Sequence, residues 1–351
     1  MLADVGLARL LPTSEQDTCA GFQQMQPLSS LPILILNVHN RCNCRCVMCD
    51  IWKREENVEM KVTSLEAHRE SMKRLGVKHV VLSGGEPLLH QDLHALCVFF
   101  RELGIRLTLL TTGLLLQKRA KDVASLFDEV IVSIDGPEEV HDSIRRVKTA
   151  FQVIRSGILA VREYSPKMPI HGRSTVQKAN HYLLRRTTQA AQQLQLTSIS
   201  FLAADLTSEA FNRPLVWPGE KQSEIALTDI EVVALEDEVE QLIREYDDDI
   251  RRKYIVETPD KLRRIPRHFR EHLGQATPES PMCNAPWVSA VVEVDGSVRP
   301  CFFHRSVGNL NDSTLEGIIN GKAAMQFRQT LSVPDNPTCQ RCVCSLNYRA
   351  S

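Results

Sequence analysis

The sequence has no long apolar run, no excess of either charge and no export signal. None of its apolar stretches reaches the roughly 18 residues that a membrane-spanning helix needs. The net charge of −1 over 351 residues gives no electrostatic attraction to nucleic acid or to an anionic membrane. The N-terminus lacks the basic flank and the unbroken apolar stretch of a signal peptide. We therefore expect a cytoplasmic protein with no nucleic-acid partner and no membrane partner.

Cysteine, in contrast, is frequent, and its spacing indicates metal ligands. Eleven cysteines would suggest disulfides in a secreted chain, but here they cluster at ligand spacings without an export signal, which indicates a reducing compartment. Cys42, Cys46 and Cys49 form a Cys-x3-Cys-x2-Cys loop directly after an apolar, strand-like run at 34–38. A disulfide within so short a loop would be strained. The loop is therefore a candidate metal site.

An iron–sulfur cluster is the interpretation that suits this loop. Closely spaced thiolates are its usual ligands, and three of them leave one iron of a four-iron cluster free to bind another molecule. Zinc is the main alternative, but a structural zinc site needs four ligands, usually grouped in pairs. The loop offers only Cys44 as a close fourth donor. Because Cys44 lies between ligand positions, we interpret it as an incidental thiol beside the cluster.

Two polar turns follow other strand-like runs. Gly84 and Gly85 remove side chains at a point where a backbone can approach a ligand closely, and Glu86 offers a carboxylate to an ammonium group. A Ser-Ile-Asp-Gly turn at 133–136 ends the run 130–132. Taken alone, each turn is an ordinary strand-to-helix connection, in which Glu86 favours a helix start.

The order of these motifs resembles the radical S-adenosylmethionine (SAM) superfamily. Its members hold a [4Fe–4S] cluster on a Cys-x3-Cys-x2-Cys loop and chelate SAM at the open iron. The resemblance covers about residues 32–204 and includes the segments Val81-Leu82-Ser83-Gly84-Gly85-Glu86-Pro87, Thr111-Thr112-Gly113, Ser133-Ile134-Asp135-Gly136 and His141-Asp142-Ser143-Ile144-Arg145. It implies reductive cleavage of SAM to a 5′-deoxyadenosyl radical, with an electron from a reductant such as flavodoxin or ferredoxin.

The resemblance also implies the residues that contact SAM. These are Met48, Gly84, Gly85, Glu86, Thr112, Ser133, Asp135 and Arg145. In the family, the Gly-Gly-Glu-Pro turn meets the amino group, and the segment from Ser133 to Arg145 contacts the carboxylate. Two positions differ from the usual pattern. Met48 stands where an aromatic residue often lies against the adenine, although a thioether can make similar soft contacts, and Thr112 replaces an amide near the ribose.

A second group of cysteines lies near the C-terminus. Cys283 and Cys301 flank a hairpin pattern, in which 288–294 is apolar with some alternation and Asp295-Gly296 is a turn dipeptide. The hairpin would bring these two cysteines together. Cys339 and Cys342, in a Cys-x2-Cys motif, would complete a four-thiolate site and leave Cys344 spare. From spacing alone, zinc and an iron–sulfur cluster are equally possible.

With the first motif present, this segment resembles the SPASM/Twitch extension of radical SAM enzymes. The four-cysteine Twitch form matches best and binds one auxiliary [4Fe–4S] cluster. A full SPASM extension has seven cysteines and two clusters, more than this segment provides. The resemblance therefore implies two [4Fe–4S] clusters in each chain.

The coarse pattern predicts an α/β fold, namely a partial (β/α)6 TIM-like barrel followed by a small Cys-rich domain of a β-hairpin and a helix. The length of the chain suggests about two domains. Expected strands are 33–38, 79–83, 106–111, 129–134, 170–176 and 198–203, and expected helices are 64–75, 91–103, 115–126, 148–163 and 180–194. Strands separated by helices imply parallel pairing, and the motifs follow strand ends, where α/β barrels place their sites.

We divide the chain into an N-terminal extension (1–31), a barrel (32–204), a connecting segment (205–282) and an auxiliary-cluster domain (283–351). In the connecting segment, the pattern predicts a helix from Thr228 to about Tyr246, with Thr228 or Asp229 as its cap. A basic stretch at 261–272 is more often a solvated helix face than an anion site. Asp205, after the sixth strand, either faces the substrate or starts a loop.

These features predict a radical SAM oxidoreductase that abstracts hydrogen from a substrate C–H, with the auxiliary cluster accepting an electron. A single auxiliary cluster resembles the arrangement in aminocyclitol dehydrogenases and some sugar epimerases, which favours oxidation or epimerisation of a small molecule. One alternative is a maturase that modifies a ribosomally made peptide, although the first thirty residues are too short for the extra peptide-recognition domain of many such enzymes. The other is a zinc-binding scaffold without catalysis, which leaves the Gly-Gly-Glu-Pro turn unexplained.

Overall fold

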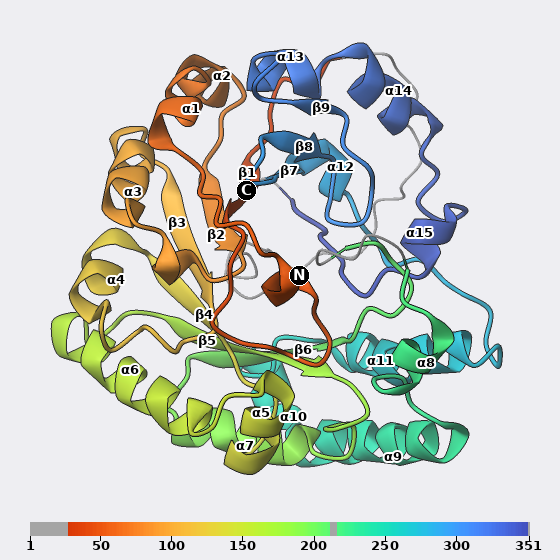
Figure 1. Ribbon diagram of the computed structural model, residues 1–351. Helices are drawn as coiled ribbons and strands as arrows, with labels where there is room; N and C mark the ends of the chain where they lie inside the picture. Colours follow the sequence, from red (N-terminus) through yellow and green to blue (C-terminus); the bar gives the residue numbers. More distant parts are fainter. Residues whose placement is uncertain (1–26, 211–215, 350–351) are drawn as a thin grey trace.

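The structure is a computed structural model that describes residues 27–210 and 216–349. Six parallel strands in the order β6-β5-β4-β3-β2-β1 curve around the centre, and helices form an outer layer (Figure 1). The strands are β1 (Ile33–His39), β2 (His79–Gly84), β3 (Arg106–Thr111), β4 (Glu129–Ser133), β5 (Ile170–Val176) and β6 (Ser198–Ala203). Each lies within one residue of its predicted range. The predicted α/β partial barrel is confirmed.

The helices outside the barrel follow the predicted alternation with three differences. They are α1 (Val62–Glu66), α2 (Arg69–Arg74), α3 (Leu93–Glu102), α4 (Ala120–Leu126), α5 (Glu138–Arg145), α6 (Ala150–Tyr164) and α7 (Leu184–Gln193). The single helix predicted at 64–75 is broken at His68, whose buried ring accepts the backbone N–H of Leu315 at 3.2 Å. Turns at 114–119 delay the start of α4. The pattern does not predict α5, because two of its three buried side chains are polar.

Residues 216–282 cover the β6 side of the sheet. They form α8 (Gly219–Ser223), α9 (Asp229–Glu245), α10 (Asp247–Arg251) and α11 (Pro259–His272). The predicted cap at Thr228 is confirmed, because Thr228 and Glu231 form a reciprocal capping box. Beyond β6, the N–H of Ile199 donates to the Tyr254 carbonyl at 2.7 Å, so the backbone there continues the sheet. Helix α11 packs against both α9 and β6.

The C-terminal part joins the barrel sheet directly. It contains α12 (Ala285–Val288), β7 (Ser289–Val292), β8 (Ser297–Arg299), β9 (Gly308–Asn309), α13 (Leu315–Ile319), α14 (Lys322–Thr330) and α15 (Pro337–Gln340). The predicted hairpin is confirmed, since β7 and β8 are antiparallel and Gly296 in the turn has φ 85°. The sequence does not predict that β7 also pairs with β1 in parallel, from Ile33 opposite Ser289 to Leu36 opposite Val292. This pairing extends the sheet to nine strands.

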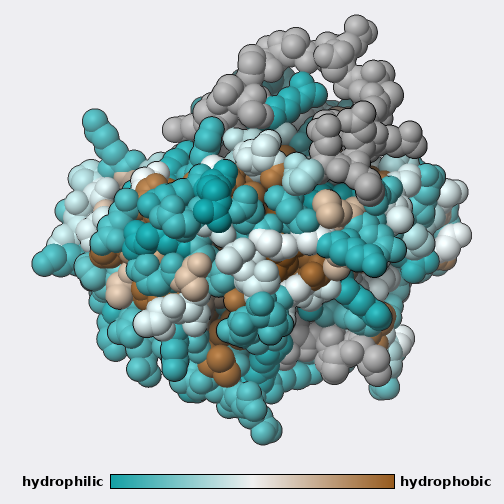
Figure 2. All heavy atoms as spheres, turned by 90° about the horizontal axis from the view of Figure 1, so that it is seen from above, coloured by the Kyte–Doolittle hydropathy of each residue, from teal (hydrophilic) through white to brown (hydrophobic). Residues whose placement is uncertain are grey.

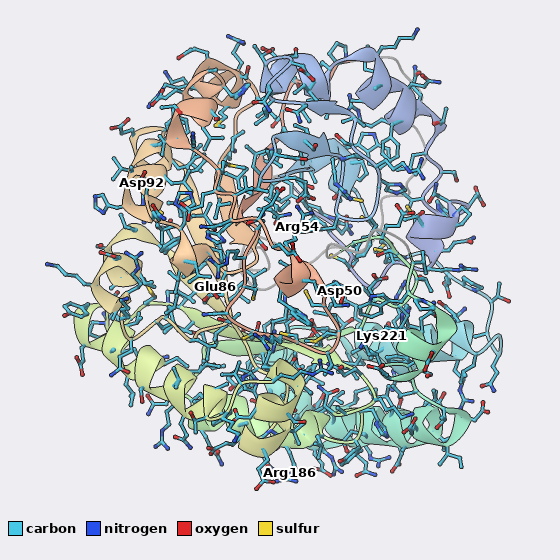
Figure 3. The ribbon with its side chains drawn as sticks, in the orientation of Figure 1. Asp50, Arg54, Glu86, Asp92, Arg186 and Lys221 are labelled. Atoms are coloured by element: carbon cyan, nitrogen blue, oxygen red, sulfur yellow. The ribbon has the colours of Figure 1, made fainter. Side chains whose placement is uncertain are left out.

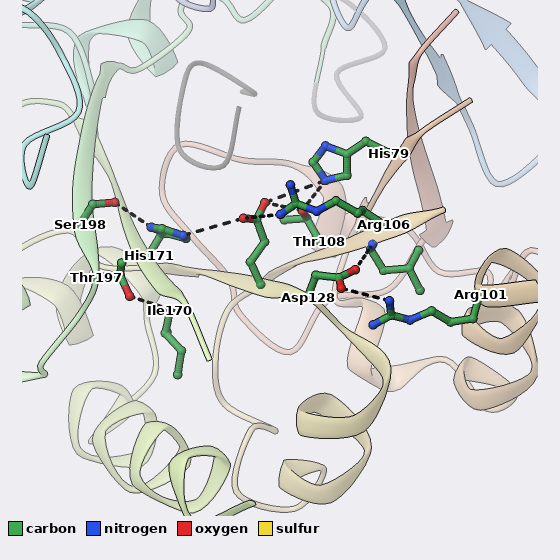
Figure 4. A network of polar contacts seen from close by, with 11 residues as sticks. His79, Arg101, Arg106, Thr108, Asp128, Ile170, His171, Thr197 and Ser198 are labelled. Carbon is green, nitrogen blue, oxygen red and sulfur yellow. Dashed lines mark hydrogen bonds and ion pairs between the residues drawn. The ribbon is translucent and has the colours of Figure 1, made fainter. Parts of the chain in front are cut away.

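A buried polar network closes the barrel at the amino ends of its strands (Figure 4). Thr108 donates its hydroxyl hydrogen to Glu129 at 2.6 Å, so the His79 Nε2 atom, also 2.6 Å away, must donate to the Thr108 oxygen. His171 bonds Ser198 at 2.8 Å on the other side. Burial, with the nearby Arg106, lowers the pKa of His79 to about 4. The histidine is therefore neutral at pH 7, and the network fills the barrel with paired polar groups.

We expect the folded protein to lose stability steeply as the pH falls from 6.5 toward 4. Burial lowers the pKa values of His79, His141 and His268 to about 4, whereas an unfolded histidine keeps a pKa near 6.5. Between these values the unfolded chain binds more protons, so the stabilisation present above pH 6.5 is lost on acidification, by on the order of 3 kcal/mol per histidine. Urea unfolding at several pH values measures the slope. A His79→Gln variant, which keeps an N–H donor, should show a shallower slope, and an equal slope would contradict the assignment.

The surface of the described residues is mostly hydrophilic in the view of Figure 2, with apolar side chains in small separate spots. Within residues 27–210 and 216–349, no helix combines the length and apolar character that crossing a membrane requires.

Candidate active site and metal centres

A cavity of about 950 Å³, partly open to solvent, lies at the carboxyl ends of the parallel strands. It is lined by the loop after β1, by the ends of β2 to β6 and by one residue near the C-terminus. The residues that the sequence predicts for the first cluster and for SAM and that line this cavity are Cys42, Cys46, Met48, Cys49, Gly84, Gly85, Thr112, Ser133 and Arg145. Two predicted residues, Glu86 and Asp135, do not line it. The motifs thus meet at the functional face of an α/β barrel.

The cysteine loop is docked on the end of α5. The backbone N–H of Arg45 donates to the Arg145 carbonyl at 3.2 Å, and that of Val47 donates to the Ile144 carbonyl at 3.1 Å. These bonds fix the loop between its first and last cysteines, so that all three thiols face the cavity. Local sequence spacing alone does not show this docking.

The environment of Cys46 favours the thiolate, which is the form that binds metal. A hydrogen bond from the Cys44 thiol and the positive charge of Arg145 lower the pKa of Cys46 to about 6, against the effect of burial. Arg145 Nη1 lies 3.5 Å from Cys46 Sγ. Cys44 itself is buried, with 2 % of its surface exposed, and does not line the cavity. Its role as an incidental thiol stays a prediction.

The two glycines are required by the backbone of the cluster loop. A Cβ atom on Gly85 would lie 1.9 Å from the Arg41 carbonyl oxygen, and one on Gly84, which has φ 117°, would lie 2.5 Å from the His39 oxygen. The N–H groups of Gly85 and Glu86 donate to these same carbonyls at 2.7 and 2.8 Å. The close approach that the glycines permit is therefore to the start of the cysteine loop, while their open side faces the cavity.

Glu86 follows the end of β2 (labelled in Figure 3) and is not among the residues that line the cavity. Its carboxylate is fully buried and accepts hydrogen bonds from Thr111 Oγ1 at 2.8 Å, from Thr112 N at 2.8 Å and from Leu88 N at 3.0 Å. Burial raises its pKa, and these donors oppose that effect. The structure thus gives Glu86 a positioning role for the turn and the end of β3. Its predicted contact with the ammonium group of SAM stays a prediction.

Thr112 links Glu86 to the cysteine loop. Its hydroxyl lies 2.7 Å from Glu86 Oε2 and 2.9 Å from the Asn43 side chain, whose Nδ2 has no partner as placed. If the amide is turned about its axis, Nδ2 donates to the Thr112 oxygen and the Thr112 hydroxyl donates to Glu86. Thr112 therefore connects Glu86 to the cysteine loop, at a position where the family usually has an amide. The sequence analysis missed Asn43, for which only its position inside the loop is a signal.

Arg145 is a buried cation that faces the cavity, with 8 % of its surface exposed. Its Nε donates to Asp135 Oδ2 at 2.5 Å, and the other carboxylate oxygen of Asp135 accepts the Thr175 N–H at 3.0 Å. Asp135 thus orients Arg145, and it does not itself line the cavity. Ser133 lines the same cavity, so a buried cation and a hydroxyl both face the space where a carboxylate could bind.

The far side of the cavity contains three residues that the sequence analysis did not select. They are Arg173 and Thr175 on β5 and Val343 in the C-terminal loop. The alternation of a strand places 171, 173 and 175 on one face, so polar residues at these positions were a usable signal. Asp205, after β6, also lines the cavity, and its contact with a substrate stays a prediction.

The basic stretch lies on α11 and is largely paired on the surface. Arg263 bonds Glu240 at 2.6 Å, and Arg270 bonds Glu236 at 2.7 Å. These pairs support the interpretation of a solvated helix face.

The second group of cysteines comes together beside β7. Cys283 and Cys301 pack on the same apolar cluster as Val291. Burial raises the pKa of Cys301 to about 11 and that of Cys339 to about 12, and the charges of neighbouring cysteines add to both shifts. Buried thiolates that repel one another need a cationic partner. These donors therefore fit an iron–sulfur cluster.

We expect Cys344→Ala to retain the iron of the second site and Cys339→Ala to lose it. The sulfur of Cys342 accepts the N–H of Cys344 at 3.4 Å, and this backbone donor survives the alanine substitution. Cys342 therefore remains our predicted ligand of the two. Iron analysis of the anaerobically purified variants tests the assignment, and an exchange of the two outcomes would make Cys344 the ligand.

Family models match both the barrel and the C-terminal segment that contains the second group of cysteines. Residues 36–176 match the radical SAM superfamily, and residues 283–343 match the SPASM iron–sulfur cluster-binding domain. Together the two matches cover more than half of the chain. A radical SAM domain binds a [4Fe–4S] cluster and SAM, and a SPASM domain binds auxiliary iron–sulfur clusters.

Curated relatives differ in how much of the chain they share. The chain is 30 % identical over 155 residues to an Fe-coproporphyrin III synthase of Methanosarcina barkeri, which is 42 % of this chain and 38 % of that protein. A pre-heme d1 synthase of Dinoroseobacter shibae is 33 % identical over 154 residues, 42 % of this chain and 37 % of its own length. The chain thus spans under half the length of these two proteins. A PqqA peptide cyclase of Xanthomonas oryzae is 23 % identical over 325 residues, 88 % of this chain and 79 % of its own.

Solved structures share the fold across most of the chain. The AdoMet-bound enzyme anSMEcpe superposes with a TM-score of 0.63 at 20 % identity, covering 85 % of this chain and 79 % of its own. SuiB of Streptococcus suis, bound to its precursor peptide, superposes with a TM-score of 0.62 at 14 % identity, covering 92 % and 73 %. The chain belongs to the radical SAM superfamily, and its C-terminal part is a SPASM iron–sulfur cluster-binding domain.

Proposed function

We propose that the protein is a radical SAM oxidoreductase that removes hydrogen from an unactivated C–H bond of its substrate. Cys42, Cys46 and Cys49 would hold the [4Fe–4S] cluster, which would supply the electron for the reductive cleavage of SAM. One observation carries the proposal: a single cavity is lined by these three thiols, by six of the eight predicted SAM contacts and, at its far side, by Val343, which directly follows Cys342 of the second site.

The chain's own residues orient and shield the reacting molecules. The buried guanidinium of Arg145, fixed by Asp135, provides a directed charge for the SAM carboxylate. The turn at 84–85 presents backbone without side chains to the cavity. Met48 and Ile51 add apolar surface on the same side, which excludes water from a reactive radical. Holding the cofactor and the substrate in one enclosed space is the protein's contribution, because the radical chemistry belongs to the cofactor.

The second site supports net oxidation of the substrate. A cluster at Cys283, Cys301, Cys339 and Cys342 would accept one electron. The substrate would then lose one hydrogen atom to the 5′-deoxyadenosyl radical, one electron to this cluster and one proton to water. A protein acceptor such as flavodoxin or ferredoxin would remove the electron. Val343 supports this route, because it lines the cavity and directly follows Cys342.

For the substrate we propose a small molecule. The far side of the cavity offers one cation, Arg173, and one anion, Asp205, beside apolar Leu110, Leu202 and Val343, which suits a polar molecule of modest size. A ribosomally made peptide is the second candidate. It is favoured by the likeness to PqqA peptide cyclase, which extends over 325 residues and both domains.

The test begins with SAM alone. Anaerobically reconstituted protein with dithionite should release 5′-deoxyadenosine and methionine, and a protein with bound iron that never cleaves SAM would refute the proposal. Any substrate that stimulates cleavage is then converted in deuterated water. A product that has lost two hydrogens without gaining deuterium at the reacting carbon means dehydrogenation, whereas one fixed solvent deuteron with no other change in mass means epimerisation. We expect the first.

A further inference from the structure

Cysteine sulfurs at both sites accept backbone hydrogen bonds in a repeated pattern. In four loops the donor is the N–H two residues after the cysteine. The pairs are Cys49–Ile51 at 3.4 Å, Cys283–Ala285 at 3.5 Å, Cys342–Cys344 at 3.4 Å and Cys301–Phe303. Such bonds stabilise negative charge on sulfur, and hydrogen bonds to the sulfurs are among the factors that set the potential of an iron–sulfur cluster.

Cys339 cannot take part in this pattern. It lies in α15, where the N–H two residues later, that of Arg341, is directed at the Pro337 carbonyl at 3.4 Å. Its own N–H is bound to the Asn336 side chain at 3.2 Å. The N–H groups of this helical turn are therefore bound to backbone carbonyls and to the Asn336 cap. A hydrogen bond to the Cys339 sulfur must come from another part of the chain.

His304 supplies that donor. Its Nε2 atom lies 3.4 Å from Cys339 Sγ, although the two residues are 35 positions apart. The ring is half-buried in the loop after β8 and packs edge-on against Phe327 of α14 at 4.8 Å between centroids, which fixes its direction. A thiolate bound to iron has no hydrogen to give. The Nε2 atom must therefore carry the hydrogen and donate it to the sulfur.

We propose that His304 is a positioning residue that raises the reduction potential of the auxiliary cluster through its hydrogen bond to Cys339. The bond stabilises the reduced cluster more than the oxidised one, because reduction adds negative charge to the sulfurs. This inference rests on the proposed function in one respect: a higher potential assists the auxiliary cluster in accepting an electron from the substrate. The hydrogen bond and its effect on potential do not depend on the substrate.

The potential of the auxiliary cluster can be measured alone in a protein that carries Cys42→Ala, Cys46→Ala and Cys49→Ala. In this background, an EPR-monitored titration compares His304→Leu, which removes the donor, with His304→Gln, which places an N–H near the same point. We expect the leucine variant to be harder to reduce by about tenfold in the equilibrium constant, which is about 59 mV for one electron, and the glutamine variant to resemble the parent. The exposed His94 on α3 provides a control, His94→Leu, with no shift.

Equal potentials in the leucine variant and the parent would overturn the proposal, as would an equal fall in the leucine and glutamine variants. If the leucine variant fails to retain four irons, His304→Asn replaces it, because the shorter amide cannot reach the sulfur. The asparagine variant should then be harder to reduce than the glutamine variant, and equal potentials would again overturn the assignment. A lowered potential with unchanged product formation in the otherwise native protein would support His304 and contradict electron acceptance, so the two proposals fail separately.

Discussion

Replacing Cys42, Cys46 and Cys49 together by alanine should halve the iron content and abolish the cleavage of SAM. The intact protein should hold on the order of eight irons per chain, four at each site. The variant keeps all the cysteines of the second site, which lie between residues 283 and 342, around β7, β8 and α15. It should therefore retain about four irons and the spectrum of one cluster, while releasing no 5′-deoxyadenosine.

The matched control is Cys97→Ala. Cys97 is fully buried on the outer helix α3 and contributes to neither site. Its loss should lower the free energy of unfolding but leave about eight irons and normal SAM cleavage. Zinc as the sole bound metal in the native protein would refute the scheme as a whole. Full iron content in the triple variant would show that the loop is not the ligand set.

Removal of the auxiliary cluster by Cys283→Ala with Cys301→Ala should separate SAM cleavage from product formation. The cavity keeps its three loop thiols, Arg145 and the turn at 84–85, so 5′-deoxyadenosine should still form. The substrate radical should then have no acceptor for its electron, and product should fall to background. Liquid chromatography with mass detection of 5′-deoxyadenosine and product in the same reaction measures the ratio of the two.

Two measurements make this result interpretable. The variant should retain about four irons and the native affinity for SAM, which shows that the barrel is intact although β7 pairs with β1. Continued product formation at the native ratio would assign the auxiliary cluster a structural role only. A complete loss of SAM cleavage, with the first cluster present, would show that the two sites cannot be separated.

Much of the barrel could be predicted because its strands are buried on both faces. Such strands read as short continuous apolar runs, and the burial of β1, with one half-buried residue in seven, is typical of them. The cysteine loop, the glycine turn and the hairpin were also local signals, and the structure places each where it was expected. Features that depend on the local spacing of residues could therefore be predicted from the sequence.

The remaining features depend on contacts between distant segments. No local pattern shows that the carboxylate of Glu86 accepts hydrogen bonds from Thr111 and Thr112, because these threonines lie 25 and 26 positions along the chain. Asp135 was chosen as a ligand contact, but its carboxylate is used by Arg145. His304 gave no signal either, since its meaning depends on Cys339 lying in a helical turn. These positions require the folded structure.

The pairing of β7 with β1 makes the barrel depend on the C-terminal third of the chain. Without β7, the backbone of β1 would present a row of unpaired N–H and C=O groups beside the apolar side chains of Ile33 and Ile35. An exposed strand of this kind is a template for pairing with another chain. A fragment that ends before residue 283 would therefore tend to aggregate. By covering this edge, the auxiliary domain protects the barrel from aggregation, in addition to any part it takes in electron transfer.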